Sequence, residues 1–315
     1  MQTKPRIPPS IAIIFGIFAA STSSLFIRFA QVEANSLAIA AFRMGFATIL
    51  LLPFMLREPR SAWPSTRRVI TLGILSGSFL AIHFASWIAS LELTSVASSV
   101  VLVQTAPLFV AVLSPMFLSE SPSGKAWIGL MVAFFGAILI AFGDSCTGTN
   151  GIVCPPLQEI FGGTALSGDL LALIGGLAGA AYLIIGRDLR SRLRLIPYIS
   201  IVYGSAAIVL LIWAGVAGVQ MLGYHWLTYI WFLLLALFPQ LLAHTTYNWA
   251  LEYLPATTVS LSLLGEPVSA AILAWVFLDE SIPALRVLGG LVVLAGIFLA
   301  VFRKNRKFTQ TILSE

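Results

Sequence analysis

Ten long apolar segments set the strongest constraint on what this chain can fold into. Each has roughly the 20 residues that a helix needs to cross the hydrocarbon core of a bilayer. The apolar runs are continuous rather than alternating, so the sequence predicts an all-α integral membrane protein with ten transmembrane helices. The predicted spans are 9–30, 36–56, 69–90, 95–118, 126–143, 169–186, 197–217, 227–250, 257–278 and 285–302.

Charged residues are too few to cover a surface that faces water. They make up 10% of the chain and apolar residues 58%, whereas soluble domains have about 25% and about 45–50%. This composition excludes soluble enzymes, disordered proteins and nucleic-acid binders, and it makes the lipid bilayer the expected surroundings. The net charge of +5 is therefore not a nucleic-acid signal.

The basic residues indicate the orientation in the membrane. If the N-terminus is cytoplasmic, Arg286 is on the outer side, while Arg28 and Arg43 lie within spans. Arg28 is near a span end, where it is expected to reach the headgroups. The remaining lysines and arginines all fall on the cytoplasmic side: Lys4, Arg6, Arg57, Arg60, Arg67, Arg68, Lys125, Arg187, Arg190, Arg192, Arg194, Arg303, Lys304, Arg306 and Lys307. The positive-inside rule then predicts a multi-pass protein of a prokaryotic cytoplasmic membrane with both termini cytoplasmic. We expect the first span to be retained rather than cleaved as a signal peptide.

The chain repeats itself after a shift of 160 positions. Pro107 falls on Pro267, and Glu120 falls on Glu280. The repeated unit contains five predicted helices, an odd number, so the second unit is predicted to have inverted topology. The predicted parts are a first repeat at 1–143, an extracytoplasmic loop at 144–168, a second repeat at 169–302 and a cytoplasmic tail at 303–315. Inverted repeats recur in secondary transporters, with the substrate site between the halves.

Three segments resemble a known family. They are Pro107-Leu-Phe-Val-Ala through Leu118-Ser-Glu120, Pro267-Val-Ser-Ala-Ala through Leu278-Asp-Glu280, and Ala40-Ala-Phe-Arg43. Together they resemble EamA-type members of the drug/metabolite transporter superfamily. The resemblance implies ten helices, a central cavity and carriage of small metabolites, often outward. Family substrates include amino acids, other metabolites and drugs. Ser119 and Asp279 depart from the pattern, because glycine is common at that position in the family.

Glu266 is the one acidic residue near the middle of a predicted span. A charge at this depth costs about 2.5–3.5 kcal/mol on insertion scales, so it is a functional-site hypothesis by default. One interpretation is proton coupling or binding of a cationic amine. The alternative is a structural carboxylate that holds a neighbouring helix or compensates a helix break at Pro267. Pro107 and Pro267 are predicted helix-bend positions.

Arg43 lies within the second predicted span. A guanidinium group can hold a substrate carboxylate or phosphate with two hydrogen bonds. The alternatives are an ion pair with Glu266 or a cap on the carbonyls of a broken helix.

Polar and aromatic residues at span depth complete the predicted binding site. His83 and Trp87 are four residues apart and share a helix face, as do His244 and Asn248. The alternative for each residue is an ordinary interhelical hydrogen bond. The predicted substrate-binding residues are Arg43, His83, Trp87, Gln104, Tyr182, His244, Tyr247, Asn248 and Glu266.

The remaining sequence features say less about the function. Cys146 and Cys154 lie in the predicted outer loop, where they could form a disulfide in an oxidising compartment; the alternative is two unpaired loop thiols. Gly175 and Gly179 favour close helix packing, with dimerisation as the alternative. No cofactor and no metal is expected, because the three His and two Cys lack metal-ligand spacing.

The sequence therefore predicts a secondary transporter of small metabolites, such as amino acids or amphiphilic compounds. It is expected to work by alternating access, with outward transport and proton coupling as finer hypotheses. The partners would be the substrate, protons and lipid, and the protein would be a monomer or a homodimer. A passive channel is the main alternative. A polytopic enzyme is a weaker one, because all four aspartates lie at span ends or in loops: Asp144, Asp169, Asp188 and Asp279.

Overall fold

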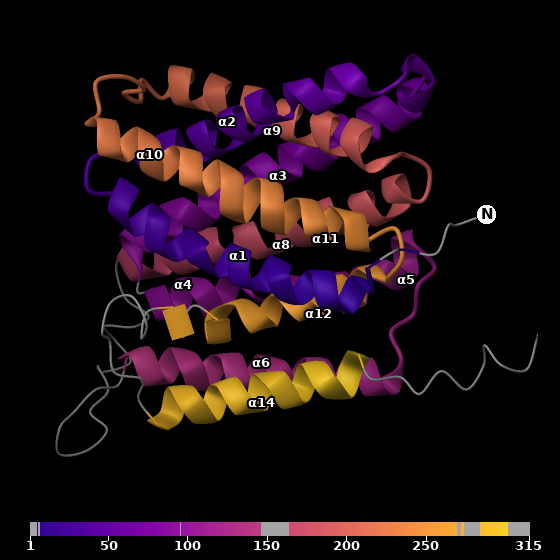
Figure 1. The fold of residues 1–315 in the computed structure, drawn as a ribbon. Coiled ribbons are helices and arrows are strands. Elements are labelled where there is room, and N and C mark those ends of the chain that lie inside the picture. The colour runs from indigo at the N-terminus through magenta and orange to yellow at the C-terminus, as the bar shows by residue number, and fades with distance from the viewer. Residues whose placement is uncertain are drawn as a thin grey trace, which may run out of the picture.

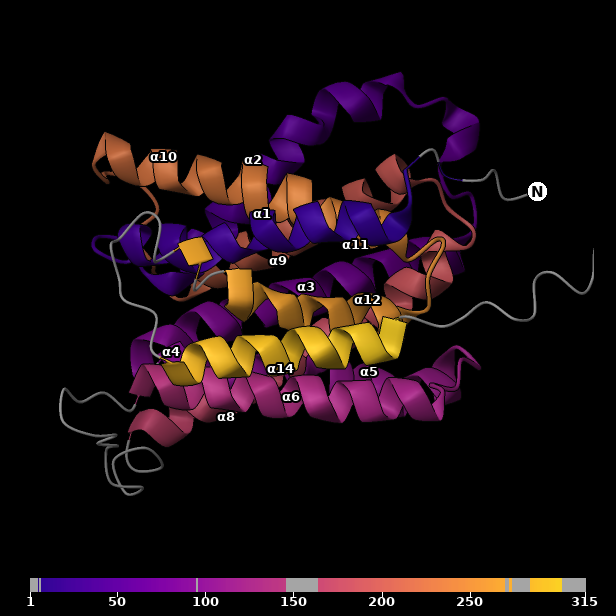
Figure 2. The same ribbon diagram turned by 60° about the horizontal axis from the view of Figure 1, so that its bottom comes forward.

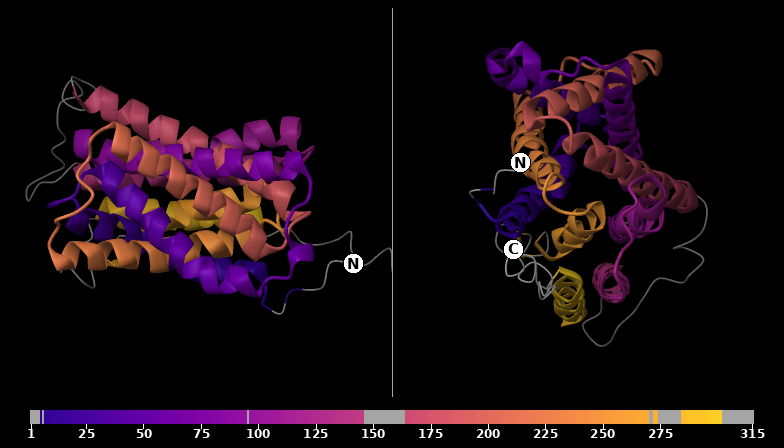
Figure 3. Two further views of the ribbon diagram at one scale, coloured as in Figure 1. Left: turned by 90° about the horizontal axis from the view of Figure 1, so that it is seen from above. Right: turned by 90° about the vertical axis from the view of Figure 1, so that its right-hand side faces the viewer.

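The protein is a bundle of helices that run side by side. The computed structural model describes residues 5, 7–94, 96–145, 164–269, 272–273 and 284–301, and no β-strand occurs within these ranges. Figures 1 and 2 show the bundle from two directions, and the right-hand view of Figure 3 looks nearly along the helices. The elements are α1 (Pro9–Ala30), α2 (Ser36–Arg57), η1 (Arg60–Ala62), α3 (Arg67–Leu93), α4 (Val96–Val103), α5 (Ala106–Phe117), α6 (Gly124–Ser145), α8 (Thr164–Arg190), α9 (Leu195–Val216), α10 (Trp226–Leu235), η2 (Ala236–His244), α11 (Thr245–Ala250), α12 (Ala256–Ser262), η3 (Leu263–Gly265) and α14 (Ala284–Val301).

Most of the predicted spans are helices of membrane-crossing length. In the described residues, seven helices are long and apolar enough to cross a bilayer: Pro9–Ala30, Ser36–Arg57, Arg67–Leu93, Ser99–Phe117, Leu166–Arg190, Leu195–Val216 and Trp226–Ala250. The fifth and tenth predicted spans overlap the shorter apolar helices Gly124–Ile140 and Val287–Ala300. The ninth predicted span lies partly outside the described residues.

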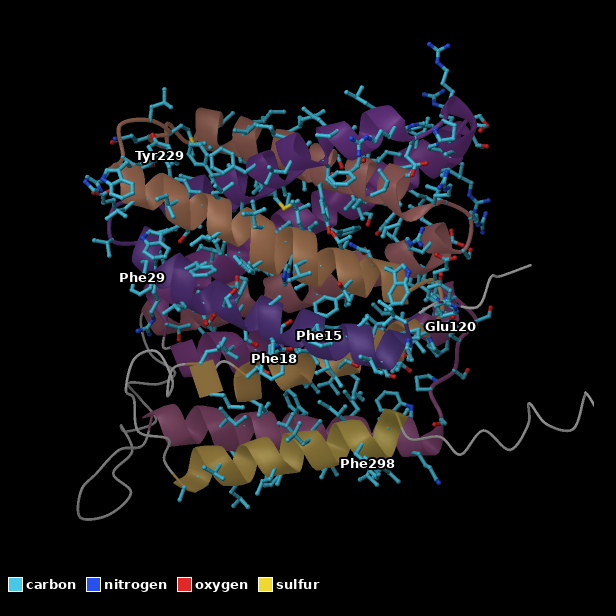
Figure 4. All side chains as sticks on the ribbon, in the orientation of Figure 1. Phe15, Phe18, Phe29, Glu120, Tyr229 and Phe298 are labelled. Atoms are coloured by element: carbon cyan, nitrogen blue, oxygen red, sulfur yellow. The ribbon has the colours of Figure 1, made fainter. Side chains whose placement is uncertain are left out.

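Large apolar side chains cover the outside of the bundle. Phe15, Phe18 and Phe298 are 68%, 44% and 57% exposed, and Figure 4 shows them on the surfaces of α1 and α14. Meanwhile Arg43 and Asn248 are buried. A soluble protein avoids large exposed apolar surfaces of this kind. This distribution of side chains is the one that a lipid-facing bundle requires.

Two helices are interrupted at corresponding positions of the predicted repeat. The α-helix stops at Gln104–Thr105 between α4 and α5, and it tightens to a 3₁₀ turn at Leu263–Gly265. Pro107 and Pro267 follow each interruption by two residues. Proline has no N–H to donate to the carbonyl four residues earlier, so the regular hydrogen-bond ladder cannot pass through it.

A third interruption lies between α10 and α11. Residues Ala236–His244 form a π-helical segment that contains Pro239. Such widened turns accommodate a residue that breaks the α-helical ladder, and they are frequent at functional sites. The wider turn changes which side chains face the bundle interior, and it directs Gln240 inward, where it is fully buried.

Four glycines allow α6 and α14 to pack backbone against backbone. A Cβ at Gly129 would lie 2.5 Å from the carbonyl oxygen of Gly296, and a Cβ at Gly289 would lie 2.8 Å from that of Gly136. Both distances are too short for a real Cβ. Because the contact partners run in opposite directions along the two helices, α6 and α14 are antiparallel. They lie side by side in Figures 1 and 2.

The other main helix contacts also connect the two predicted halves. The helix α1 packs against α10, η2 and α11, α3 packs along α8, and α2 packs on α9. Gly175 and Gly179 of α8 lie against Ser86 and His83 of α3, so the predicted close packing at these glycines is observed within one chain.

The helices extend further than predicted at the boundary of the halves. The helix α8 begins at Thr164 and α6 runs to Ser145, inside the predicted loop 144–168. Thr94 donates a 2.8 Å hydrogen bond to the buried carboxylate of Asp169, which holds the first turns of α8 against α3. Cys146 and Cys154 lie outside the described residues.

Candidate functional site

A buried arginine lies at the centre of the candidate site. Arg43 of α2 is 1% exposed. Its Nε donates to Oε1 of Gln240 at 3.0 Å, and one terminal nitrogen donates to Oγ of Ser23 at 3.0 Å. The guanidinium carbon lies 3.9 Å from the ring centroid of Phe84, a cation–π contact. Arg43 is therefore held by neutral groups on three other elements.

No carboxylate within the described ranges lies close enough to Arg43 for an ion pair at 4.0 Å. The predicted alternative of a direct Arg43–Glu266 ion pair is thus not what the structure has. The physical reason is that the guanidinium is turned toward Gln240 and Ser23, whereas Glu266 is hydrogen-bonded elsewhere.

An aromatic path leads from Arg43 to the neighbouring helices. The rings of Phe84 and His244 meet edge to face at 5.3 Å. His244 lies 6.2 Å from Tyr182 and 5.8 Å from Tyr247, ring centroid to ring centroid. Such separations and tilts are favourable for aromatic pairs. Nδ1 of His244 has no hydrogen-bond partner in the described structure.

His83 and Trp87 continue this path along α3. Their rings stack at 6.1 Å, as the four-residue spacing predicts, and His83 lies 4.9 Å from Phe84. Nδ1 of His83 is 2.8 Å from the carbonyl oxygen of Gly175, which fixes the ring on α8. The indole N–H of Trp87 is buried and has no acceptor among the described residues.

Glu266 lies at the far end of the aromatic path, directly after the 3₁₀ turn. Tyr247 donates its hydroxyl to Oε1 of Glu266 at 3.3 Å, and Ser21 donates to the Glu266 backbone oxygen at 3.0 Å. These contacts hold α12 and the residues after it against α1 and α11. The Glu266 carboxyl group and the Arg43 guanidinium are thus two separate ionisable groups in the bundle interior.

Asn248 joins two buried tyrosines. Tyr182 donates to its Oδ1 at 2.8 Å, and its Nδ2 donates to the Tyr203 hydroxyl at 3.3 Å. The Tyr203 hydroxyl also lies 3.3 Å from Oγ1 of Thr245. This chain of hydrogen bonds ties α8, α9 and α11 together beneath His244.

Gln104 lies at the interruption between α4 and α5 rather than on the aromatic path. Its side-chain amide donates to the carbonyl oxygen of Leu263 at 3.3 Å. Leu263 is four residues before Pro267, so its carbonyl cannot receive the hydrogen bond that a regular helix would give it. The N–H of Glu266 and the side-chain amide of Gln104 both donate to this carbonyl instead, and substrate binding by Gln104 stays a prediction.

The structure brings most of the predicted site residues into one network. Contacts through Phe84 and His244 connect eight of the nine predicted substrate-binding residues: Arg43, His83, Trp87, Tyr182, His244, Tyr247, Asn248 and Glu266. The sequence reasoning missed Ser23, Phe84, Tyr203 and Gln240. A phenylalanine in an apolar span carries no signal, but Gln240 directly after Pro239 is an amide at span depth and could have been singled out.

Ion pairs gather at the end of the bundle where α1 begins, and Figure 4 shows Glu120 there. Arg187 of α8 donates to Oε1 of Glu120 at 2.7 Å and to the carbonyl oxygen of Leu251 at 2.5 Å. Oε2 of Glu120 accepts the N–H of Ala256 at the start of α12. Arg194 pairs with Glu58 at 2.7 Å. Both ion pairs join the first predicted half to the second.

The opposite end, marked by Phe29 and Tyr229 in Figure 4, is joined by a helix cap. Glu33, between α1 and α2, accepts the Thr228 hydroxyl at 2.7 Å and the N–H of His225 at 3.0 Å. These hydrogen bonds lower the pKa of Glu33 below its usual value. A carboxylate at the start of α10 is also favoured by the helix dipole.

The described residues contain no group of three or more His, Cys, Asp or Glu side chains that could hold a metal ion. Long apolar helices with a polar interior define a multi-pass membrane protein. The EamA-like transporter family matches residues 8–142 and 166–302, and the chain belongs to this family. It is accordingly a transporter and not an enzyme.

Several known proteins are similar to the chain. The uncharacterized transporter YdfC of Bacillus subtilis is 24% identical over 85% of this chain and 82% of its own length. An uncharacterized transporter of Archaeoglobus fulgidus is 23% identical over 92% and 94%. The S-adenosylmethionine uptake transporter of Rickettsia bellii is 25% identical over 40% of this chain and 43% of its own length. A protein of known crystal structure has the same fold, with a TM-score of 0.73 over 93% of this chain and 96% of that chain at 15% identity.

Proposed function

We propose that the protein is a secondary transporter that carries a small amphiphilic metabolite by alternating access. The observation that carries this proposal is the interior network, which holds one guanidinium and one carboxylate among aromatic rings. Ionisable groups at this depth are costly and mark substrate or ion pathways. The apolar rings suit the body of a small molecule, and the charged groups suit its polar ends.

We propose ten helices in two inverted five-helix repeats, with the site between them. The double match to the family supports this arrangement. Phe84 and His244 occupy corresponding positions of the 160-residue repeat, and their rings touch each other. Residues in this relation lie close to a two-fold axis between the halves. This contact supports a site at the interface of the halves, where transporters with inverted repeats bind their substrates.

The distribution of basic residues supports an orientation with both termini in the cytoplasm of a prokaryotic cell. The ion pairs of Arg187 with Glu120 and of Arg194 with Glu58 then lie at the cytoplasmic end. Opening that end would separate the two halves there. In this mechanism the interruptions before Pro107 and Pro267 supply the bending, and net transport is outward.

Each charged group has a distinct proposed role. Glu266 exchanges the coupling proton, and its contact with the Tyr247 hydroxyl is remade or broken as the carboxylate changes charge. Arg43 anchors an anionic group of the substrate. The remaining network residues line the site. The protein works as a monomer or a homodimer, because each chain supplies all of these groups.

Counterflow in proteoliposomes tests the proposal. Vesicles are preloaded with unlabelled amino acids, amphiphilic cations or S-adenosylmethionine, and uptake of the matching labelled tracer is followed with and without a pH gradient. S-adenosylmethionine belongs in the panel because partial relatives are named as its uptake transporters. Saturable counterflow by one pool supports a carrier, whereas uptake that never saturates supports a passive channel.

Glu266→Gln tests the coupling role. The variant keeps the size of the side chain and removes its titration, so counterflow should persist while stimulation by a pH gradient disappears. Glu92→Gln is the matched control, because Glu92 is an exposed carboxylate at a helix end that accepts hydrogen bonds from Ser36. Full stimulation of the Glu266→Gln protein by the gradient would refute proton coupling through this residue.

A further inference from the structure

The side-chain amide of Gln240 has a fixed orientation. Nε of Arg43 is a donor and arginine has no acceptor, so the atom of Gln240 that faces Arg43 must be the carbonyl oxygen. The NH₂ group of the same amide therefore does not bond to Nε of Arg43 and can donate to another acceptor. Gln240 is fully buried, and its Nε2 makes no hydrogen bond of good geometry among the described residues, although the Tyr203 hydroxyl lies beside the amide. Leaving a buried amide donor without a well-formed hydrogen bond is costly, so this amide is suited to an additional acceptor.

Arg43 also has no anionic group in direct contact. Its hydrogen-bond partners, Gln240 and Ser23, are neutral, and no described carboxylate pairs with it within 4.0 Å. Glu266 interacts with it electrostatically, but only beyond ion-pair distance. A buried cation without a contacting counter-ion is costly in a membrane interior. The amide of Gln240 and the guanidinium of Arg43 are adjacent, and both favour the same kind of ligand atom: an anionic oxygen.

We propose that Arg43 and Gln240 form one subsite for the carboxylate group of the transported molecule. This inference rests on the proposed carrier function and names the chemistry of its substrate. The guanidinium supplies the charge and a hydrogen bond, and the Gln240 amide donates a second hydrogen bond to the carboxylate. A monoanionic carboxylate matches this subsite better than a phosphate group, because Arg43 is the only arginine or lysine that the described structure places in the network.

The position of the subsite also limits the rest of the molecule. Phe84 covers one face of the guanidinium, and His244, His83 and Trp87 follow along the aromatic path. An aromatic or branched apolar group attached to the carboxylate would lie along these rings. Gln240 then determines specificity, since it contributes the second donor and sets the orientation of Arg43.

Gln240→Glu is the sharpest test, because it is nearly isosteric. The new carboxylate would stand 3.0 Å from Nε of Arg43 and would neutralise it from within the protein. The variant should therefore fold at least as stably as the wild type but lose affinity for carboxylates. Gln220→Glu is the matched control, because it makes the same change in an exposed loop.

Binding is measured on the purified full-length protein in detergent as ligand-dependent thermal stabilisation. The probes are 3-phenylpropionate, 3-phenylpropionamide and 3-phenylpropylamine, which share one apolar body and differ in charge. The wild type and Gln220→Glu should bind the carboxylate about tenfold to a hundredfold more tightly than the amide, as a charged hydrogen bond of about 1.5–3 kcal/mol implies. Gln240→Glu should lose this preference.

Three results would overturn the subsite. They are equal affinity for the carboxylate and the amide, retained carboxylate preference in Gln240→Glu, and no saturable stabilisation by any probe. Stabilisation by sodium chloride to the same extent would assign the site to an inorganic anion and overturn the carboxylate. If Gln240→Glu is not monodisperse, Gln240→Met removes the amide without adding charge and should reduce carboxylate affinity.

The transport assay separates this inference from the proposed function. Saturable counterflow without any carboxylate preference would refute the subsite and leave the carrier intact. Carboxylate binding that depends on Gln240, in a protein that shows no counterflow, would refute the carrier and leave the binding site.

Discussion

Alanine substitution of the glycines between α6 and α14 tests the close packing of these two helices. The expected loss of stability can be worked out from the distances in the structure. In Gly129→Ala the new Cβ would lie 2.5 Å from the Gly296 carbonyl oxygen, where 3.4 Å begins ordinary van der Waals contact. Two of the three nearest atoms are backbone and the third is the Cβ of Ala300, which no side-chain rotation can move, so the helices must move apart by about 0.9 Å. Overpacking of this kind costs about 1–3 kcal/mol.

A second glycine serves as the control with the opposite expectation. Gly45 lies within α2, and a Cβ there would have no atom within 4 Å. Alanine is favoured over glycine in a helix by about 1 kcal/mol. Gly45→Ala should therefore be neutral or stabilising, and Gly129→Ala should be less stable than Gly45→Ala by about 1–3 kcal/mol, because both variants gain the same helix preference.

The assay is reversible unfolding in mixed micelles with increasing dodecyl sulfate, followed by circular dichroism. Gly289→Ala should resemble Gly129→Ala, because its Cβ would lie 2.8 Å from the Gly136 carbonyl oxygen. If Gly129→Ala and Gly45→Ala unfold at the same dodecyl sulfate fraction as the wild type, the close approach of α6 and α14 is wrong.

Two further predictions concern the ends of the bundle. The side chains of Glu120 and Arg187 are each exposed by about a quarter or less. A double-mutant cycle with Glu120→Gln and Arg187→Gln should therefore give a coupling free energy of about 1–2 kcal/mol in the same unfolding assay. Additive effects of the two substitutions would contradict the ion pair. Hydrogen bonds from Thr228 and the His225 N–H lower the pKa of Glu33 in the folded protein. The stabilisation of the fold by Glu33 is therefore fully present above the unfolded pKa of about 4.3, and it is lost as pH falls through the lower pKa of the folded state. Protection of the amides at the start of α10 from hydrogen exchange, corrected for the intrinsic exchange rate, should therefore fall below about pH 4. A Glu33→Gln protein, which lacks this titration, should show no such fall.

The bundle of apolar helices could be predicted because lipid leaves few alternatives. A continuous run of about 20 apolar residues must satisfy its backbone internally, so length alone identifies most spans. The four-residue spacing of His83 and Trp87 also placed the two rings on one face. Glu266 and Arg43 were identified because charge at that depth is costly, and both are found in the interior network.

The partners of these charges could not be predicted. Pairing depends on helix rotation and depth, and the widened turn at Ala236–His244 changes the rotation of everything that follows it. An α-helical reading of this segment gives no reason for Gln240 to meet Arg43. Phe84 was missed for a different reason, since the surface of every span contains similar apolar residues.

The glycine contact between α6 and α14 has a consequence for the origin of the chain. Gly129 meets Gly296 and Gly136 meets Gly289, and each pair becomes the other when both members are shifted by 160 positions. A contact with this property is isologous: it is the self-complementary interface of a homodimer, contained in one polypeptide. One five-helix unit, inserted into the membrane in both orientations, would make the same interface between two separate molecules. Fusion of two such units into one gene would then have freed each copy to diverge. The position that holds Arg43 in the first unit accordingly holds Tyr203 in the second.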